Sequence, residues 1–264
     1  ISYMSAAPRF NLLWQQHDQY WIGVFAKGGN FTPQVAQALK SAGMQFVSAG
    51  AVSLRTSRDW KSAWEPIYAA LQQTDALSVV SVGLTPGDVQ SNAYMPVDHK
   101  TPADIQAIAE SLWLGDALLQ NRVLCYLQPI VSAKEKIFGY ESFARVKMPD
   151  GKIIGGAAVI AASKALGIEY MIDRMLHVQA IRTFISSDFN GFLFVNFFPG
   201  FIQRPAVYLE GLTEAVKAYG LVGKHIVLEF TKSETPRDLA HVKGVCEYGR
   251  SRGYRSEEHT SELQ

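Results

Sequence analysis

The stretch from Gly191 to Thr231, GFLFVNFFPGFIQRPAVYLEGLTEAVKAYGLVGKHIVLEFT, decides the fold class of this chain. Two short apolar runs, 191–198 and 225–231, flank a longer amphipathic segment at 206–220. Short apolar runs predict buried strands and the amphipathic segment predicts a helix, so the order is strand, helix, strand. Strands that are apolar almost throughout are typical of a parallel sheet covered by helices.

The same alternation extends on both sides of this stretch. Upstream, strands are predicted at 122–131 and 136–146, followed by a helix-rich segment at 155–187, and a further helix is predicted downstream at 237–253. Repeated strand–helix units predict an α/β fold, either a TIM-like barrel or a doubly wound sheet.

The N-terminal part of the chain is also predicted to be α/β. Strands are expected at 20–26, 44–50 and 76–83, and helices at 33–42 and 60–73. Thr32 is the expected N-cap of the first helix, Pro33 its first residue and Gly43 its stop, whereas Pro66 is expected to kink the second. Residues 1–83 are therefore predicted to form one domain, 84–100 a proline-containing linker, and 101–254 a second domain.

Composition narrows the range of possible partners and compartments. The chain has 264 residues, of which 48% are hydrophobic and 19% charged, and its formal net charge is +1. Such a balanced charge argues against a nucleic-acid duplex as partner. The two cysteines, Cys125 and Cys246, form no metal-binding spacing, and no apolar run is long enough to span a bilayer, so we expect a cytoplasmic protein.

Three of the predicted apolar strands carry one polar side chain near the carboxyl end: Glu141, Asn196 and Glu229. The carboxyl ends of barrel strands are where active sites form. Two carboxylates and an amide oxygen are the ligands that Mg²⁺, Mn²⁺ or Ca²⁺ prefer. The residues alone leave a second interpretation open, in which all three side chains bond to loop backbone.

Four motifs in series resemble those of EAL-domain cyclic-di-GMP phosphodiesterases. YLQPIVSAKEKIFGYESFARV (126–146) resembles the family's opening strand and its glutamate-alanine-leucine signature, and GIEYMIDRML (167–176) resembles the helix that carries an aspartate. FVNFFP (194–199) is similar to the VNxSP strand, and IVLEFTKSE (226–234) to the LEITES strand. The resemblance covers about residues 112–254 and implies an incomplete TIM-like barrel after the N-terminal α/β domain.

The resemblance also implies roles for single residues. Glu141, Asn196 and Glu229 would bind metal ions, Mg²⁺ or Mn²⁺. Gln128, Arg145 and Asp173 would contact cyclic di-GMP, with the planar guanidinium of Arg145 at a phosphate. In this family two metal ions activate a water that opens the cyclic dinucleotide to linear pGpG.

Several positions depart from the family pattern. The signature reads Glu141-Ser142-Phe143, Phe198 replaces a small serine, and Lys232 stands at a position usually held by glutamate. The last ten residues, RSEEHTSELQ (255–264), are what one reading frame of a common sequencing-adapter oligonucleotide encodes. We therefore expect natural sequence to stop near Tyr254, before the family's paired aspartates and catalytic lysine.

Three functions follow as hypotheses for the intact protein. The first is hydrolysis of cyclic di-GMP; the second is a degenerate EAL module that serves as a cyclic-di-GMP receptor or protein scaffold. The third is a metal-dependent hydrolase of another phosphoester. The resemblance further implies a homodimer formed through the EAL domain, a regulatory protein partner, and a regulatory role for residues 1–83.

We expect the chain as written not to hydrolyse cyclic di-GMP, because it lacks the carboxylate pair that would hold the second metal ion. Purified chain incubated with cyclic di-GMP and Mg²⁺ or Mn²⁺ should yield no pGpG by chromatography. Turnover to pGpG would contradict this expectation.

Overall fold

The computed structural model describes residues 19–48, 51–86, 99–197, 204–230 and 239–258. These residues belong to two compact units, one comprising residues 1–116 with 165–167, the other residues 117–164 with 168–264. The predicted boundary between Gly83 and Thr101 stays a prediction, since residues 87–98 lie outside the described part. No described helix has the length and apolar character needed to cross a bilayer.

The first unit contains a four-stranded antiparallel sheet in the order β2-β3-β1-β4. Along the chain, the elements are β1 (Tyr20–Ala26), α1 (Pro33–Ser41), β2 (Gln45–Ser48), β3 (Val52–Ser57), α2 (Trp60–Gln73) and β4 (Val80–Pro86). This βαββαβ order with an antiparallel sheet is the ferredoxin-like topology.

Local signals placed the two helices of this unit correctly. Thr32 accepts a hydrogen bond from the Val35 amide at 3.3 Å, with Pro33 as the first residue of α1, which confirms the expected start. The helix α2 covers the predicted 60–73 and has Asp59 as its N-cap.

In this unit the structure contains one strand that the sequence did not predict and moves the bounds of another. The strand β3 was missed, since its sequence VSLRTS is too polar to stand out as an apolar run. The predicted strand at 76–83 starts late: Ala76–Ser78 form a 3-10 helix after Asp75, whose φ is 53°, and β4 begins at Val80. β4 also extends to Pro86, into the segment predicted as a linker.

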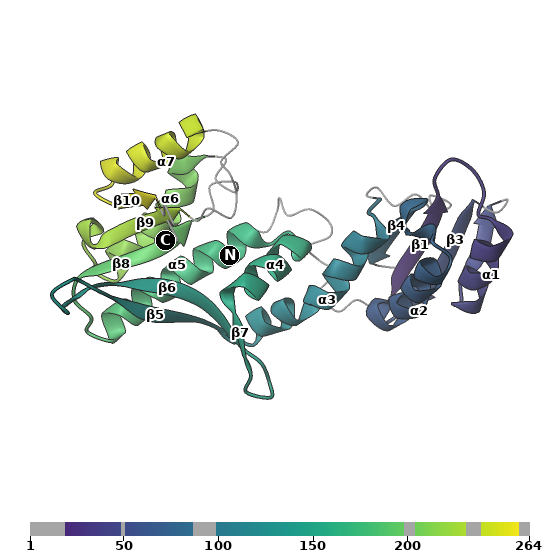
Figure 1. Ribbon diagram of the computed structural model, residues 1–264, viewed down its shortest axis with the longest axis horizontal. Helices are drawn as coiled ribbons and strands as arrows, with labels where there is room; N and C mark the ends of the chain where they lie inside the picture. The colour runs from purple at the N-terminus through teal and green to yellow at the C-terminus, as the bar shows by residue number, and fades with distance from the viewer. Residues whose placement is uncertain (1–18, 49–50, 87–98, 198–203, 231–238, 259–264) are drawn as a thin grey trace. The chain divides into compact units, whose positions relative to one another are not determined.

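The second unit is built on an open sheet in the order β10-β9-β8-β6-β5, with β7 paired to β6 (Figure 1). The helix α3 (Pro102–Leu119) crosses from the first unit into the second. The remaining elements are β5 (Val123–Val131), β6 (Ile137–Lys147), β7 (Ile153–Gly155), α4 (Gly156–Leu166), α5 (Glu169–Ser186), β8 (Phe192–Phe197), α6 (Pro205–Ala218), β9 (Ile226–Phe230), α7 (Leu239–Ser251) and β10 (Arg255–Glu258).

The strands β6, β8, β9 and β10 pair in parallel, as repeated strand–helix units predict. One sheet face packs against apolar side chains of α5, α6 and α7; Leu193, Val195 and Phe197 of β8 belong to this core. Strand residues alternate between faces, so Asn196 and Phe194 point to the opposite face. The described strands therefore form an open part of an α/β sheet, not a closed ring.

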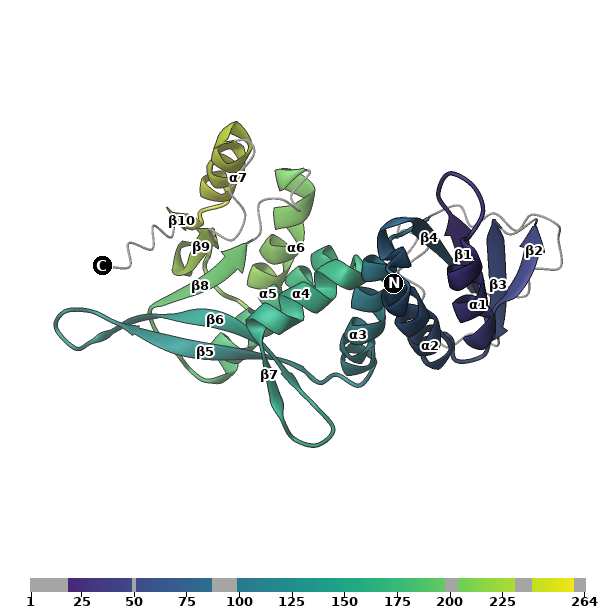
Figure 2. The same ribbon diagram turned by 45° about the vertical axis from the view of Figure 1, so that its right-hand side comes forward.

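The expectation of a parallel sheet covered on both faces fails for β5, which pairs in antiparallel fashion with β6. These strands form a long antiparallel hairpin, visible in both views (Figure 1 and Figure 2). The segment that joins them, 132–136, is far too short for the crossover that parallel strands require. The hairpin leaves Val131, Ile137 and Phe138 exposed, unlike a strand covered on both faces.

The adapter interpretation of residues 255–264 stays a prediction. In the structure Arg255–Glu258 form β10 and pair in parallel with β9. The buried Tyr254, whose hydroxyl donates to Thr213 Oγ1 at 2.8 Å, anchors the chain directly before this strand. From that anchor an extended segment can satisfy the open edge of β9 with backbone hydrogen bonds alone.

The close approach of β6 and β8 generates a stability prediction. A Cβ atom added at Gly139 would lie 2.5 Å from the backbone oxygen of Phe192, which pairs with Gly139 in the ladder. We expect Gly139→Ala to lower the free energy of unfolding by about 1–3 kcal/mol in urea denaturation, because the strand must shift. Gly244→Ala in α7 has open space around the new methyl group and should be neutral or stabilising. Equal stability of Gly139→Ala and wild type would contradict this packing.

Candidate functional site

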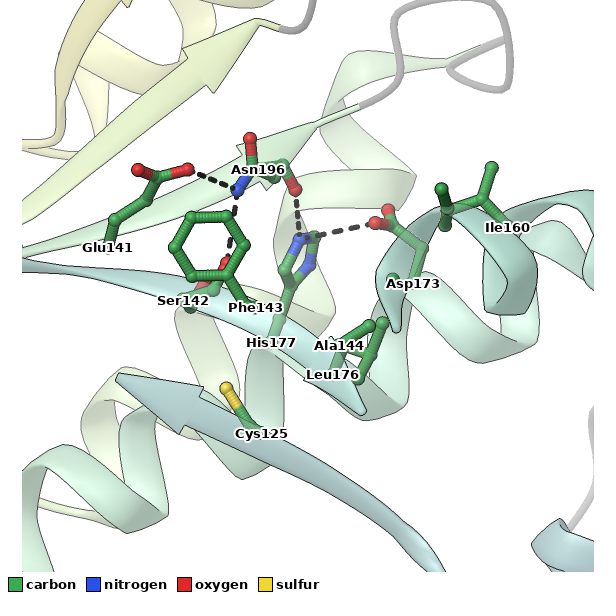
Figure 3. Close-up of a pocket in the computed structure, with 12 residues that line it drawn as sticks. Cys125, Glu141, Ser142, Phe143, Ala144, Ile160, Asp173, Leu176, His177 and Asn196 are labelled. Carbon is green, nitrogen blue, oxygen red and sulfur yellow. Dashed lines mark hydrogen bonds and ion pairs between the residues drawn. The ribbon is translucent and has the colours of Figure 1, made fainter. Parts of the chain in front are cut away.

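A cavity of about 270 Å³ lies where β6 and β8 meet α4 and α5 (Figure 3). Its polar groups come from Glu141 and Ser142 of β6, Asp173 and His177 of α5, and Asn196 of β8. Phe143, Ile160 and Leu176 add apolar wall. The cavity therefore brings together three of the six predicted site residues: Glu141, Asn196 and Asp173.

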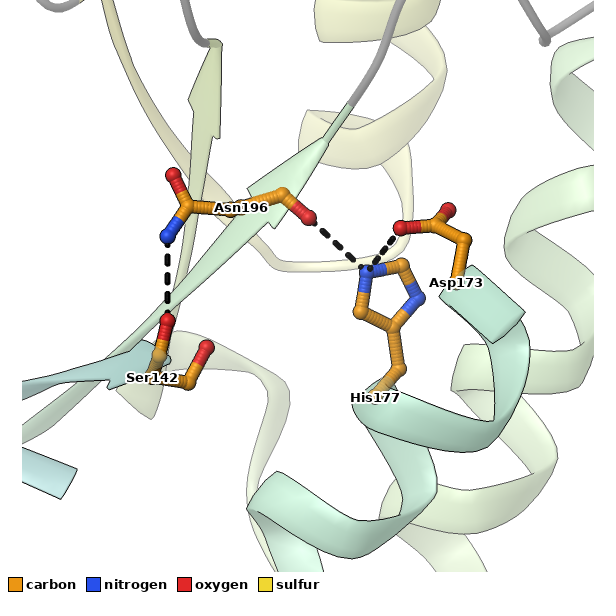
Figure 4. A network of polar contacts seen from close by, with 4 residues as sticks. All are labelled: Ser142, Asp173, His177 and Asn196. Atoms are coloured by element: carbon orange, nitrogen blue, oxygen red, sulfur yellow. Dashed lines mark hydrogen bonds and ion pairs between the residues drawn. The ribbon is translucent and has the colours of Figure 1, made fainter. Parts of the chain in front are cut away.

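Besides its place in the β8–β9 ladder, Asn196 makes three hydrogen bonds at this cavity. Its side-chain Nδ2 donates to the Ser142 carbonyl at 3.0 Å and to Glu141 Oε1 at 3.3 Å. Its backbone carbonyl accepts from His177 Nε2 at 3.0 Å (Figure 4). Because both donations use the amide nitrogen, the amide oxygen Oδ1 is the atom positioned to coordinate a cation.

Glu229 lies next to Asn196 in the parallel ladder between β8 and β9, which pairs these two residues directly. Leu228 and Phe230 belong to the apolar core, so alternation directs Glu229 to the same sheet face as Asn196. The carboxylate is buried, with 3% of the residue exposed, although Glu229 does not line the cavity.

Gln128 and Arg145 are on the hairpin and do not line the cavity. Gln128 is exposed and pairs with Glu141 across the β5–β6 ladder, which puts both side chains on one face. The Arg145 guanidinium lies 5.5 Å from the ring of Phe143 and 5.8 Å from that of Tyr126, and its Nη1 donates to the Ala144 carbonyl at 2.8 Å. The aromatic rings thus hold the cation beside the site.

Asp173 and His177 lie one helical turn apart on α5 and meet inside the protein. The distance from Asp173 Oδ1 to His177 Nε2 is 3.4 Å, and both side chains are almost fully buried. Burial raises the pKa of the Asp173 carboxyl well above its usual value. Burial also lowers the pKa of His177 to about 4, and the hydrogen bond to the Asn196 carbonyl only partly offsets this effect.

The contact has the geometry of an ion pair, but burial opposes charge on both partners. Burial therefore favours the neutral form of each partner, and the imidazole Nε2–H points at the Asn196 carbonyl. Asp173 Oδ2 is buried and has no hydrogen-bond partner within the described residues. A protonated carboxyl at this position can donate a hydrogen bond to a ligand, which an ionised one cannot.

His177 was missed as a site residue, because the six histidines looked scattered along the chain. The signal that could have identified it is its spacing from Asp173. Two polar residues four positions apart on an otherwise apolar helix face are expected to meet. His225, a partly buried histidine, donates from Nδ1 to the Gly191 carbonyl at 2.8 Å, directly before β8 begins.

The donor set at this sheet face fits a hard divalent cation. Glu141 and Asn196 are in contact, and Glu229 is the neighbour of Asn196 on the next strand. Within the described ranges, no group of three or more His, Cys, Asp or Glu side chains is arranged around one metal position. Two carboxylates and one amide oxygen would leave coordination positions for water or phosphate oxygens.

The low pKa of His177 generates a prediction on stability. The unfolded chain binds a proton on this histidine below its usual pKa of 6.5, whereas the folded chain does so only near pH 4. The stability contributed by neutral His177 is therefore present above pH 6.5 and lost as the pH falls towards 4. Relative to His177→Gln, which cannot take up this proton, wild type should lose about 2–3 kcal/mol between pH 7 and 4.5. Urea denaturation at both pH values measures this, and parallel pH curves would contradict it.

Comparison with known proteins assigns the second part of the chain to a family. The model of the EAL domain matches residues 112–256, more than half of the chain. No curated protein sequence gives a significant match. A standalone EAL protein from Vibrio cholerae O395, solved in its c-di-GMP-bound form, is 29% identical, with 52% of this chain and 56% of that chain covered at a TM-score of 0.46.

Two other solved structures have TM-scores of 0.50. The FimX EAL domain from Pseudomonas aeruginosa, bound to c-di-GMP, is 22% identical, with 61% of this chain and 63% of that chain covered. The S helix-GGDEF-EAL fragment of Vibrio cholerae LapD, also bound to c-di-GMP, is 12% identical, with 95% and 73% covered. At this identity the two structures show the fold alone. The chain covers less than two thirds of the standalone Vibrio cholerae EAL protein and of the FimX EAL domain. The family match over residues 112–256 shows that the chain belongs to the EAL-domain family.

Proposed function

We propose that this chain binds cyclic di-GMP together with a divalent cation at the cavity between β6, β8 and α5. The observation that carries the proposal is the contact of Glu141 with Asn196 at 3.3 Å, at the edge of a cavity also lined by Asp173. Both residues belong to the region matched by the EAL family, and three of that family's solved members, as their names state, hold c-di-GMP.

In this proposal Glu141, Asn196 and Glu229 hold Mg²⁺ or Mn²⁺. The ion would neutralise phosphate charge and lower the pKa of a bound water. The protein contributes the orientation: the Ser142 carbonyl fixes the amide nitrogen of Asn196, which turns Oδ1 towards the ion. Burial of Glu229 strengthens its attraction for a cation, since charges interact more strongly away from water.

The dinucleotide would lie along the hairpin and the cavity. Arg145 retains donors besides the one bound to the Ala144 carbonyl, so its guanidinium can bind a phosphate without losing that bond. Gln128, on the same face as Glu141, would contact the ligand from the neighbouring strand. Burial raises the pKa of the Asp173 carboxyl, which favours the protonated form that would donate a hydrogen bond to a base acceptor.

Hydrolysis to pGpG is the leading activity for the intact protein, and a receptor without catalysis is the second candidate. The observation that favours a receptor is the position of Phe143, whose ring lines the cavity and stacks beside Arg145 at 5.5 Å. An aromatic wall that holds the arginine favours retention of a bound ligand. The protein is proposed to be cytoplasmic, to form a homodimer through the EAL domain, and to receive regulatory input through residues 1–83 and a protein partner.

Calorimetric titration with cyclic di-GMP tests the proposal. Wild-type chain should bind the dinucleotide more tightly with Ca²⁺, an ion that suits these oxygen ligands, than with EDTA. Glu141→Ala should weaken binding with Ca²⁺ by at least about tenfold, because it removes one of three protein ligands. Glu247→Ala is the matched control: this glutamate is exposed on α7, pairs with Lys243 at 3.9 Å, and should leave affinity unchanged.

Two outcomes would overturn the proposal. One is absence of binding by a folded wild-type chain, as judged by circular dichroism. The other is equal affinity of wild type and Glu141→Ala in the presence of Ca²⁺. Binding that is insensitive to EDTA would remove the cation from the proposal and leave the dinucleotide site.

A further inference from the structure

We propose that His177 is a positioning residue that fixes Asn196 for metal coordination and links it to Asp173. The inference rests on the proposed function, since it assigns a task to a residue at the same site. It starts from the end of the β6–β8 ladder, whose last pair is Glu141 with Phe194. Asn196 lies two residues beyond that pair, where the backbone of β6 no longer supports β8.

Beyond the last β6–β8 pair, hydrogen bonds made by side chains support β8 on this side. Asn196 Nδ2 reaches the Ser142 carbonyl at 3.0 Å, and His177 Nε2 reaches the Asn196 carbonyl at 3.0 Å from α5. One bond fixes the side chain of Asn196 and the other fixes its backbone (Figure 4). Loss of the Nδ2 bond would let the amide oxygen rotate away from the sheet face that carries Glu141 and Glu229. Loss of the His177 bond would leave this part of β8 supported only from the side of β9.

The imidazole is itself held rigidly. Its ring stacks on Phe197, with centroids 4.3 Å apart and planes at 28°, and meets Tyr208 edge-on at 6.2 Å. Phe197 directly follows Asn196, so the same ring contacts two successive residues of β8. A tightly packed ring has little freedom to move, so its hydrogen bond holds the Asn196 carbonyl in one position.

A purely apolar packing role does not account for a histidine at this position. The residue is 4% exposed, and burial disfavours its charged form strongly enough to hold its pKa at about 4. Leucine would fill such space without desolvating two ring nitrogens. The histidine donates a hydrogen bond to the Asn196 carbonyl and contacts Asp173 at 3.4 Å. It therefore connects a proposed metal ligand, Asn196, to the residue proposed to contact a base of the dinucleotide, Asp173.

The test compares two substitutions at His177 with a substitution at His225, a histidine that bonds the backbone at the other end of β8. Gln places its amide nitrogen near the position of Nε2 and can keep the donation, whereas Leu packs without a donor. His225 bonds the Gly191 carbonyl at 2.8 Å before the start of β8, so His225→Leu removes a similar bond away from the cavity. All three variants are made in the full chain and checked for folding by circular dichroism.

Affinity for cyclic di-GMP with Ca²⁺ is the first measurement. His177→Leu should weaken it by about tenfold or more, as loss of a residue that orients a metal ligand does elsewhere. His177→Gln and His225→Leu should stay within about threefold of wild type. Equal affinity of His177→Leu and wild type, or equal loss in His177→Leu and His225→Leu, would overturn the assignment.

The second measurement needs no ligand and separates this inference from the proposed function. In ¹⁵N-labelled chain without dinucleotide, the side-chain amide protons of Asn196 should exchange slowly with solvent in wild type and His177→Gln. They should exchange faster in His177→Leu but not in His225→Leu. If wild type binds no cyclic di-GMP, the proposed function fails, and the exchange rates alone decide whether His177 positions Asn196. Unchanged exchange in His177→Leu would overturn the inference.

Discussion

The hydrogen bond from the Asn196 amide to the Ser142 carbonyl is the constraint on which this site depends. It joins β8 to β6 beyond the last backbone pair of their ladder, and it sets which atom of the amide faces a ligand. The contact with Glu141 and the proximity of Glu229 follow from the same placement, since the three strands are adjacent in the sheet. Sheet geometry brings the three strand ends together, and hydrogen bonds to Asn196 fix its orientation among them.

The apolar core explains why those polar groups share one face. Leu193, Val195 and Phe197 point into the core between β8 and the helices, which leaves Asn196 on the other face by alternation. The same rule places Glu229 of β9 on that other face, because its neighbours Leu228 and Phe230 belong to the core. Burial of the alternate residues therefore determines the direction of these polar side chains, and a one-residue shift in register would turn them into the core.

Much of this arrangement could be predicted from the sequence because it depends on local periodicity. The helices α1 and α2, the strands β8 and β9, and the polar residues near the strand ends were all visible as patterns. The antiparallel hairpin of β5 and β6 was not, since apolar runs do not report strand direction; only the short connection at 132–136 does. β3 and β10 escaped prediction because polar residues can still complete a ladder with their backbone.

Of the two α5 residues at the site, Asp173 was predicted from the sequence and His177 was not. Asp173 entered through a resemblance, but the role of His177 depends on how α5 packs against β8, a tertiary feature that no short motif encodes. Gln128 and Arg145 were also predicted from the resemblance, and their roles stay predictions. The structure holds both residues on the hairpin, outside the cavity lining.

A double-mutant cycle between Glu141 and Asn196 tests the central claim most directly. Affinity for cyclic di-GMP with Ca²⁺ is measured for wild type, Glu141→Gln, Asn196→Leu and the double variant. If the two residues hold one cation, the double variant should be little weaker than the worse single variant, because the ion is already lost. Losses that add independently, as they do for distant sites, would contradict a shared metal site.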